Sequence, residues 1–369
     1  MERHKKPDNS AANALRRGWT TGACATAATK SALSALLDGE FIDPVEISLP
    51  KGDMPSFALA HERSGDGFAE AGIVKDAGDD PDVTHGATII SRVEFGAKGT
   101  GICFKAGSGV GTVTKPGLPI AVGEASINPV PRDLMIAVIK KICTAHSIDP
   151  DITVTISVPG GEKIAERTWN PRLGILDGIS ILGTTGVVHP FSCSAWIHSI
   201  HRGIDVSRAE GITHVLGATG STSETAACKI HDFPEAGMLD MGDFVGGLLK
   251  YLRQNPIPRI TLAGGFAKFT KLAQGAMDLH SGRSQVDFDW LAQETAKFNV
   301  NQNIKQQIQD ANTAMEALEL TQDSGINLPP QIASIAQDQA LKILRGAPVK
   351  VEVMIFTRDG KLLARTDWK

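Results

Sequence analysis

Apolar and polar positions divide the chain into two patterns that meet near residue 151. Before that point, short apolar runs separated by polar turns predict strands at 45–49, 57–61, 68–74, 87–95 and 101–105. The alanine- and leucine-rich residues 23–37 predict a helix that Thr20 or Thr21 can cap, and "INPVPRDLMIAVIKKICTAH" predicts a second helix. Short, mainly antiparallel strands with two helices are typical of an α+β domain.

From residue 151 an apolar strand, a glycine turn and a helix alternate. The runs "ITVTISVP", "GISIL", "THVLGATG" and "RITLAGG" predict buried strands, as in a doubly wound parallel sheet. Long helices are expected over 288–318 and 330–344, followed by a hairpin around Asp359-Gly360. We therefore expect a disordered tail at 1–16, an α+β domain at 17–150, and an α/β domain at 151–369 with a helical C-terminal extension and a terminal hairpin.

Composition and charge narrow the class of protein. The net charge of the chain is −4, so we expect no broad basic surface of the kind that nucleic-acid binding requires. No apolar run reaches the length of about 18 residues that a transmembrane helix needs. The five cysteines are scattered without a CxxC pair, which favours free thiols in a reducing cytoplasm over disulfides. Four residues of types that can bind metals lie close together in the sequence: His189, Cys193, His198 and His201. Their spacing is not that of a zinc site, so we expect no protein-bound metal.

Three glycine turns follow predicted parallel strands: Gly183 to Gly186, Gly217 to Ser221, and Gly264-Gly265. We expect all three at the carboxyl edge of one sheet, where such sheets bind ligands. Glycine lets a ligand approach the backbone, and the hydroxyls and free N–H groups suit a nucleoside or nucleotide. None of the turns matches a dinucleotide fingerprint or a phosphate loop. The alternative is that these glycines only make tight turns between strands and helices.

A basic segment follows the last of these turns. Lys268 and Lys271 are neighbours on one helix face, and His280 and Arg283 come shortly after them. Basic groups near a ligand edge would suit a substrate with several carboxylates. Solvated lysines on a surface helix are the alternative.

Five stretches together resemble one known family: "GWTTGACATAATKSAL", "GSGVGTVTKPGLP", "GEASINPVPR", "NPRLGILDGISILGTTGVVHPFS" and "LAGGFAKFTKLAQGAMDLHS". They are similar to the cobalt-precorrin-5B C1-methyltransferase family of cobalamin biosynthesis, from about Arg17 to Asp287 and more loosely to the C-terminus. The resemblance implies transfer of a methyl group from S-adenosylmethionine to C1 of a cobalt corrinoid, giving cobalt-precorrin-6A. It also implies two domains, an α+β domain like the second domain of ribosomal protein S5 and a Rossmann-like α/β domain. Two positions depart from the family pattern, Asp177 where a glycine is expected and Leu279 where a threonine is expected.

Site residues follow as hypotheses from this reading. The adenosyl-methionine site would be lined by Gly183, Thr184, Thr185, Gly186 and Gly217, with Thr219 and Ser221 reaching polar groups of the cofactor. The substrate's carboxylates would meet Arg132, Lys268, Lys271 and Arg283, and its ring or side chains would meet Thr20, Thr21 and Asn128. His280 is the candidate proton shuttle, because an imidazole titrates near neutral pH; a carboxylate contact is its alternative role.

The expected partner is a cobalt-corrinoid small molecule that carries its own metal, with no nucleic acid and no membrane. A homo-oligomer and transient contacts with neighbouring pathway enzymes are compatible with this interpretation. Two other functions stay open: a nicotinamide-dependent tetrapyrrole reductase, and a non-catalytic carrier of a corrinoid intermediate. The missing third glycine argues against the reductase. A purely structural protein would leave the three glycine turns without a purpose.

Overall fold

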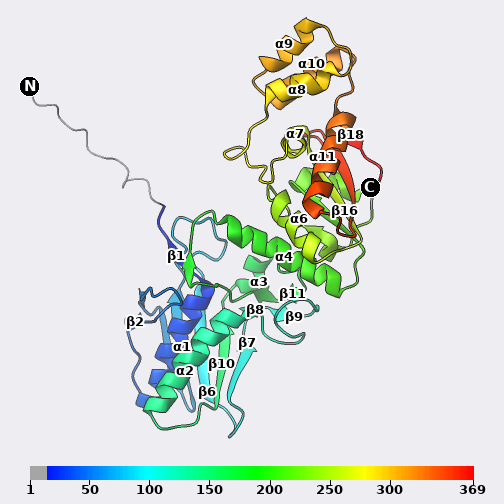
Figure 1. Ribbon diagram of the computed structural model, residues 1–369. Helices are drawn as coiled ribbons and strands as arrows, with labels where there is room; N and C mark the ends of the chain where they lie inside the picture. The colour runs from blue at the N-terminus through cyan, green and yellow to red at the C-terminus, as the bar shows by residue number, and fades with distance from the viewer. Residues whose placement is uncertain (1–14) are drawn as a thin grey trace, which may run out of the picture. The chain divides into compact units, whose positions relative to one another are not determined.

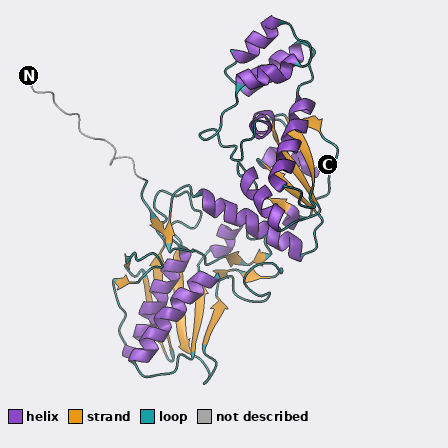
Figure 2. Cartoon of the chain, viewed as in Figure 1, coloured by secondary structure: helices purple, strands orange, loops and turns teal. Residues whose placement is uncertain are grey.

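The computed structural model describes residues 15–369, which form two compact units (Figure 1). The first unit ends at Cys193, and the second runs from Ser194 to Lys369. Both contain helices and sheets (Figure 2), so the fold is of the mixed α/β kind that the sequence predicts.

A mixed five-stranded sheet forms the centre of the first unit. Its strands, in spatial order, are β4 (His61–Gly65), β5 (Phe68–Val74), β6 (Thr88–Phe95), β10 (Ile152–Ser157) and β7 (Ile102–Ala106). One face is covered by α1 (Thr21–Asp38) and α2 (Pro129–Ala145) (Figure 1). Alanines of α1 pack with Met135 and Ile139 of α2 and with alternate residues of the strands in one core, as the alternating pattern requires.

The expected domain boundary near residue 151 is wrong. Residues 152–157, predicted to start the second sheet, form β10 of the first sheet, antiparallel to β6 and parallel to β7. The next predicted strand also stays in the first unit, where β12 (Gly178–Ile179) pairs with β8 (Gly109–Val110). The apolar alternation marks these residues as strands, but it carries no information about which sheet they join.

Short elements complete the first unit. The remaining pairs of strands are β1 (Gly18–Trp19) with β13 (Val187–Val188), β2 (Val45–Glu46) with β3 (Ser56–Phe57), and β9 (Thr112–Val113) with β11 (Ile175–Leu176); α3 (Gly161–Ala165) lies between β10 and β11 in the chain. Of the expected tail, residues 1–14 lie outside the described residues. Arg16 was also expected in the tail, but its backbone N–H donates to Asp79 Oδ2 at 2.6 Å and its guanidinium pairs with Asp76.

The second unit contains a second five-stranded sheet. In spatial order its strands are β15 (Met238–Leu239), β14 (His214–Ala218), β16 (Arg259–Gly265), β17 (Lys350–Phe356) and β18 (Leu362–Arg365). The first four are parallel, and β18 returns antiparallel after the predicted hairpin. In chain order this is 2-1-3-4-5, which places a reversal of strand order between β14 and β16.

Apolar side chains of this sheet alternate between two cores, one on each face. Leu262 and Val353 join the larger core with α6 (Val245–Gln254), α7 (Phe266–Ala273) and α11 (Pro329–Leu344). Ala263 and Met354 join the smaller core with α5 (Ser221–Cys228). The unit also contains α4 (Cys193–Ala209) and the short 3₁₀ turn η2 (Glu235–Gly237). A parallel sheet with helices on both faces confirms the predicted pattern for residues 214–356.

The long helix expected over 288–318 is wrong, because three helices occupy this region. They are α8 (Phe288–Ala296), α9 (Gln302–Gln309) and α10 (Ala314–Asp323). The side chains of Asn301 and Thr313 accept hydrogen bonds from the backbone of Ile304 and Glu316, and such N-caps begin new helices. Across residues 15–369, no helix combines the length and the apolar character needed to cross a bilayer.

Candidate functional site

The first group of predicted site residues gathers where α1 begins. Thr20 is the N-cap, and its hydroxyl accepts a hydrogen bond from Ala23 N at 3.2 Å, as the sequence predicts. Thr21 holds the neighbouring loop, because its hydroxyl accepts from Leu182 N at 2.9 Å and donates to Leu182 O at 3.2 Å. These bonds place the loop of residues 182–186 directly against the amino-terminal end of α1.

The two glycines of that loop are explained by packing. Gly183 has φ of +138°, and a β-carbon there would lie 2.3 Å from Thr20 Oγ1. Gly186 has φ of +82°, and its β-carbon would lie 2.5 Å from the side chain of Leu49. Both positions therefore need glycine for backbone conformation and for close approach, whether or not a ligand binds.

The start of α2 meets the same loop. Asn128 precedes α2, and its N–H donates to Ile181 O at 2.9 Å. The guanidinium of Arg132 already has partners within the first unit. It donates to the backbone oxygens of Ile127 and Ala125 at 2.8 and 3.0 Å, and it forms an ion pair with Glu124 at 2.7 Å. The structure thus brings four predicted residues and one predicted loop together in the first unit: Thr20, Thr21, Asn128, Arg132 and residues 183–186.

The other two glycine turns lie in the second unit, so the expectation that all three share one sheet edge is wrong. Gly217–Ser221 follows β14 and Gly264-Gly265 ends the adjacent β16, at the carboxyl side of the reversal in strand order. Thr219 N donates to Ala263 O at 2.9 Å, and a β-carbon on Gly264 would lie 2.6 Å from Thr219 Oγ1. These two turns are in contact at the edge where parallel sheets bind ligands.

Gly217 differs from its neighbours. It lies inside β14, and a β-carbon there would lie 3.2 Å from the side chains of Leu248, Leu262 and Met241. Glycine at this position therefore leaves room for the side chains that pack in the core of the second unit. Thr219 and Ser221 lie beyond the end of the strand, where their hydroxyls can reach a ligand.

A shallow pocket of about 260 Å³ lies beside this edge, between α5 and the turn that joins β17 to β18. Its lining carries three hydroxyls, one amine and one carboxylate: Ser221, Thr222, Thr225, Lys229 and Asp359, with Ala226 and Gly360. Hydrogen bonds, the largest from Thr357, lower the pKa of Asp359, so its carboxylate is charged at neutral pH. The pocket thus offers both signs of charge and several hydrogen-bonding groups.

The predicted basic residues after β16 lie together, and each already has a hydrogen-bond or ion-pair partner within the unit. Lys268 pairs with Asp243, and Arg283 pairs with Asp278 at 2.6 Å. Lys271 is only 6% exposed, and its amine donates to Leu279 O at 3.1 Å, an oxygen that it shares with Lys268. Burial, and after it the charge of Lys268, lowers the pKa of Lys271. His280 is exposed, and its Nδ1 accepts from Gly282 N at 3.1 Å.

The two departures from the family pattern have local explanations. Asp177 lies in the first unit between β11 and β12 with φ of +67°. That region favours glycine, which is the residue expected there. Leu279 is fully buried in the larger core of the second unit, so an apolar side chain suits the position.

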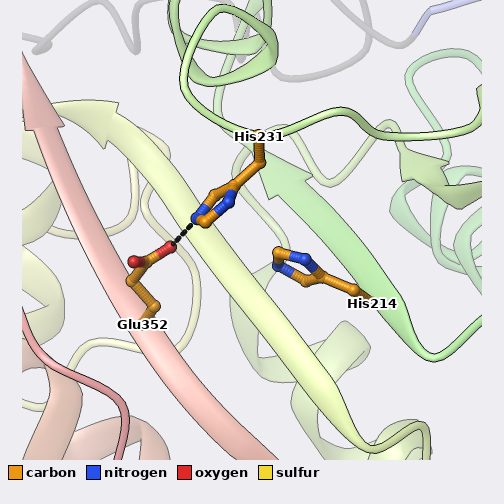
Figure 3. A group of neighbouring side chains, drawn as sticks. All are labelled: His214, His231 and Glu352. Carbon is orange, nitrogen blue, oxygen red and sulfur yellow. Dashed lines mark hydrogen bonds and ion pairs between the residues drawn. The ribbon is translucent and has the colours of Figure 1, made fainter.

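The histidines of α4 do not form a four-ligand site. His198 and His201 have ring centroids 6.1 Å apart, and His201 stacks on Tyr251 at 3.9 Å. A different group was missed by the sequence reasoning, because its members lie far apart in the chain: His214, His231 and Glu352 (Figure 3). The pairing of β14 with β16, the pairing of β16 with β17 and the fold of the segment after α5 bring them together, so no local spacing could have revealed them.

Comparisons with known proteins agree with the sequence resemblance. Residues 8–190 match the CbiD family, and residues 278–367 match the CbiD C-terminal domain. Curated proteins called cobalt-precorrin-5B C(1)-methyltransferase from Brucella anthropi, Brucella canis and Brucella suis are each 65% identical over 351 residues, which cover 95% of this chain and 95% of each relative. The crystal structure of a cobalamin biosynthesis protein (cbiD) from Archaeoglobus fulgidus is similar with a TM-score of 0.40 and 27% identity, covering 73% of this chain and 83% of that chain. The matches to the two family models and the 65% identity with these relatives show that the chain belongs to the CbiD family.

Proposed function

We propose that this protein transfers the methyl group of S-adenosylmethionine to C1 of cobalt-precorrin-5B, giving cobalt-precorrin-6A in cobalamin biosynthesis. The observation that carries the proposal is the 65% identity, over 95% of both chains, with relatives that bear the name of this methyltransferase. Family membership extends across both units of the chain. The first unit then corresponds to the domain that resembles ribosomal protein S5, and the second to the Rossmann-like domain.

The residues at the carboxyl edge of the second sheet fit the cofactor. S-adenosylmethionine carries an ammonium, a carboxylate, ribose hydroxyls and the sulfonium that supplies the methyl group. The pocket beside α5 offers Lys229 for the carboxylate, Asp359 for the ammonium, and the hydroxyls of Ser221 and Thr222. Its volume of about 260 Å³ suits one end of such a ligand and leaves the rest to lie over Thr219 and Gly264-Gly265.

Transfer of a sulfonium methyl group is an in-line displacement, so the protein acts mainly by holding the two reacting atoms close, aligned and dry. The electron-rich ring supplies the nucleophilic carbon, and no strong base is required. We propose that Thr20, Thr21 and Asn128 hydrogen-bond the corrinoid ring or its side chains. Lys268 and Arg283 would exchange their present carboxylate partners for those of the substrate.

Arg132 and Lys271 have supporting roles in this proposal. The donors of Arg132 are already directed at Ala125, Ile127 and Glu124, so it holds the start of α2 in place. The amine of Lys271 is buried beneath Lys268, so its charge contributes at a distance. His280 stays the candidate proton shuttle or carboxylate contact, and its exposure leaves it accessible to substrate.

The proposal also includes a cytoplasmic location, which suits a chain whose five cysteines form no disulfide. The corrinoid brings its own cobalt. We also propose that the protein forms a homo-oligomer. It would make transient contacts with the enzymes that supply and consume the labile corrinoid.

The first experiment is separate calorimetric titration of the purified protein with S-adenosylmethionine and with NADPH. Saturable binding of S-adenosylmethionine alone supports methyl transfer, and binding of NADPH alone would favour the reductase. Binding of neither cofactor, repeated in the presence of a cobalt corrinoid, would favour the carrier. Lys229→Ala and Asp359→Asn are expected to weaken S-adenosylmethionine at least tenfold, while 5′-methylthioadenosine, which lacks the amino-acid end, should bind both variants as it binds the parent protein. Lys250→Ala, on α6, is the matched surface control.

A further inference from the structure

A polar cluster lies at the amino-terminal end of the second sheet, opposite the edge proposed for the cofactor. His214 is the first residue of β14, and Glu352 is the third residue of β17. His231 follows α5 in the chain and reaches over the same end of the sheet (Figure 3). Thr261 of β16 lies between the two strands, paired in register with Glu352. Three strands and a loop therefore converge on one point.

The side chains of this cluster are in direct contact. His231 Nε2 lies 2.7 Å from Glu352 Oε2, and Thr261 Oγ1 donates to the same oxygen at 2.8 Å. His214 Nε2 lies 2.9 Å from Thr261 Oγ1. The carboxylate of Glu352 is only 1% exposed, so the interior holds a charged group that needs strong partners.

We propose that His214, His231 and Glu352 bind one divalent cation of the first transition row, with zinc as the best match. One ligand atom from each residue lies within 4.8 Å of the other two, so small side-chain rotations bring all three onto one ion. Two imidazoles and one carboxylate are a common donor set for zinc. The hydroxyl of Thr261 or a water molecule is available to complete a tetrahedral shell.

The imidazoles are suited to this role. Both rings are held in place by aromatic neighbours: the ring centroids of Phe233 and Trp368 lie 4.6 and 5.1 Å from that of His214, and 5.6 and 6.1 Å from that of His231.

Arg365 is the group that competes with the ion. Its Nε donates to Glu352 Oε1 at 2.7 Å, and its Nη2 lies 3.3 Å from His231 Nε2. The bond to Oε1 leaves Oε2 for the metal, but the positive charge of the guanidinium beside the site repels a cation. The arginine side chain is 41% exposed, so its second nitrogen can turn toward solvent when the ion enters. Removal of this guanidinium should therefore strengthen metal binding.

The position of the site predicts its role. The ion would join β14, β17 and the segment after α5 at the end of the sheet away from the methyl-transfer chemistry. We therefore expect it to stabilise the fold of the second unit, because a metal that binds only the folded state adds its binding free energy to stability. Occupancy of the site should leave the affinity for S-adenosylmethionine unchanged.

The test uses the full-length protein, freed of metal with a chelator and dialysed. Calorimetric titration with Zn²⁺ should show one equivalent bound, and Co²⁺ should give the visible absorption bands of a tetrahedral nitrogen–oxygen site. His231→Gln and Glu352→Gln should each weaken Zn²⁺ binding by about a hundredfold or more. Arg365→Gln should strengthen it by about tenfold, because it removes a positive charge beside the ion. His198→Gln is the matched control, because it removes an exposed histidine of the same unit outside the cluster.

Circular dichroism of each variant checks folding. If Glu352→Gln does not fold, His231→Gln and Arg365→Gln decide the question, because both side chains are partly exposed. Three results overturn the proposal: no stoichiometric uptake by the parent protein, equal uptake by His231→Gln, or loss of uptake in His198→Gln alone. None of these results depends on S-adenosylmethionine binding. The metal site and the proposed methyltransferase function are therefore tested independently of each other.

Discussion

The hydroxyl of Thr20 occupies the space where a side chain at residue 183 would begin. A β-carbon on Gly183 would lie 2.3 Å from Thr20 Oγ1, and the same hydroxyl caps α1 by accepting from Ala23 N. The glycine and the cap are therefore a single arrangement that joins the start of α1 to a loop much later in the chain. A change in either residue should disturb both.

Gly183→Ala should lower the free energy of unfolding by about 1–3 kcal/mol, because the new methyl group meets Thr20 and the backbone has φ of +138°. Urea denaturation followed by circular dichroism measures the change. Gly220→Ala is the control, since Gly220 has extended backbone and no atom within 4 Å of the added carbon. Equal stability of the two variants would show that the loop relaxes without cost.

Thr20→Ala should cost about 1 kcal/mol through loss of the N-cap. Thr20→Ser keeps the hydroxyl and should recover most of that stability. Thermal unfolding of the two variants distinguishes the stability contributed by the cap hydrogen bond from that contributed by the packing of the threonine methyl group. If serine were as destabilising as alanine, packing against Gly183 would be the larger contribution.

Lys75→Met should lower the free energy of unfolding by about 3 kcal/mol, because it leaves the carboxylate of Asp82 without its cation. Lys75 is 1% exposed, and its amine donates to Asp82 Oδ2 at 2.6 Å. Equilibrium unfolding at pH 7 measures the loss. Replacement of an exposed lysine, Lys98→Met, should have little effect.

The same pair predicts a pH dependence. Burial acts to raise the pKa of Asp82, but the charge and hydrogen bond of Lys75 and the two bonds from Thr84 outweigh it, so the pKa lies below its usual range. A carboxyl group with a lowered folded-state pKa stabilises the fold above its unfolded pKa of about 3.9. That stability is lost as the pH falls through the folded pKa. Stability measured from pH 6 to pH 2 should therefore fall less steeply in Asp82→Asn than in the parent protein.

Arg132→Gln should reduce stability rather than substrate affinity. The guanidinium donates to the carbonyls of Ala125 and Ile127 and pairs with Glu124, and an unsatisfied buried carbonyl costs about 1–3 kcal/mol. Thermal unfolding and corrinoid titration of the same variant distinguish the two effects. A normal melting temperature together with weak corrinoid binding would show that Arg132 binds the substrate instead.

His280→Ala tests the candidate proton shuttle. If His280 transfers a proton during the reaction, the single-turnover methylation rate should fall by about a hundredfold, with binding of S-adenosylmethionine unchanged. Lys268→Met should instead raise the KM for the corrinoid through loss of a carboxylate partner. An unchanged single-turnover rate in His280→Ala would remove any catalytic role for this histidine.

Local signals in the sequence were reliable where the physics is local. The cap at Thr20, the hairpin turn at Asp359-Gly360 and the alternation of strands and helices over residues 214–356 all depend on neighbouring residues. The breaks that give α8, α9 and α10 also had a local signal, in the capping residues Asn301 and Thr313, that the apolar pattern concealed.

Long-range features could not be predicted in this way. An apolar alternation identifies a strand but not its neighbours, so residues 152–157 were assigned to the wrong sheet. A glycine looks the same whether it admits a ligand or a neighbouring side chain, and Gly183 and Gly217 proved to be packed against protein atoms. The cluster of His214, His231 and Glu352 depends on strand order, which no spacing in the sequence expresses.

The place of β10 in the first sheet also has a consequence for synthesis on the ribosome. This strand lies between β6 and β7, which are made earlier, and β13 pairs with β1 from the far end of the unit. A nascent chain of 150 residues therefore holds two sheet edges that have no partner, and such edges attract other chains. The edges of β6 and β7 gain their partner only when residues 152–157 have emerged, so until then the nascent chain is open to pairing with other chains.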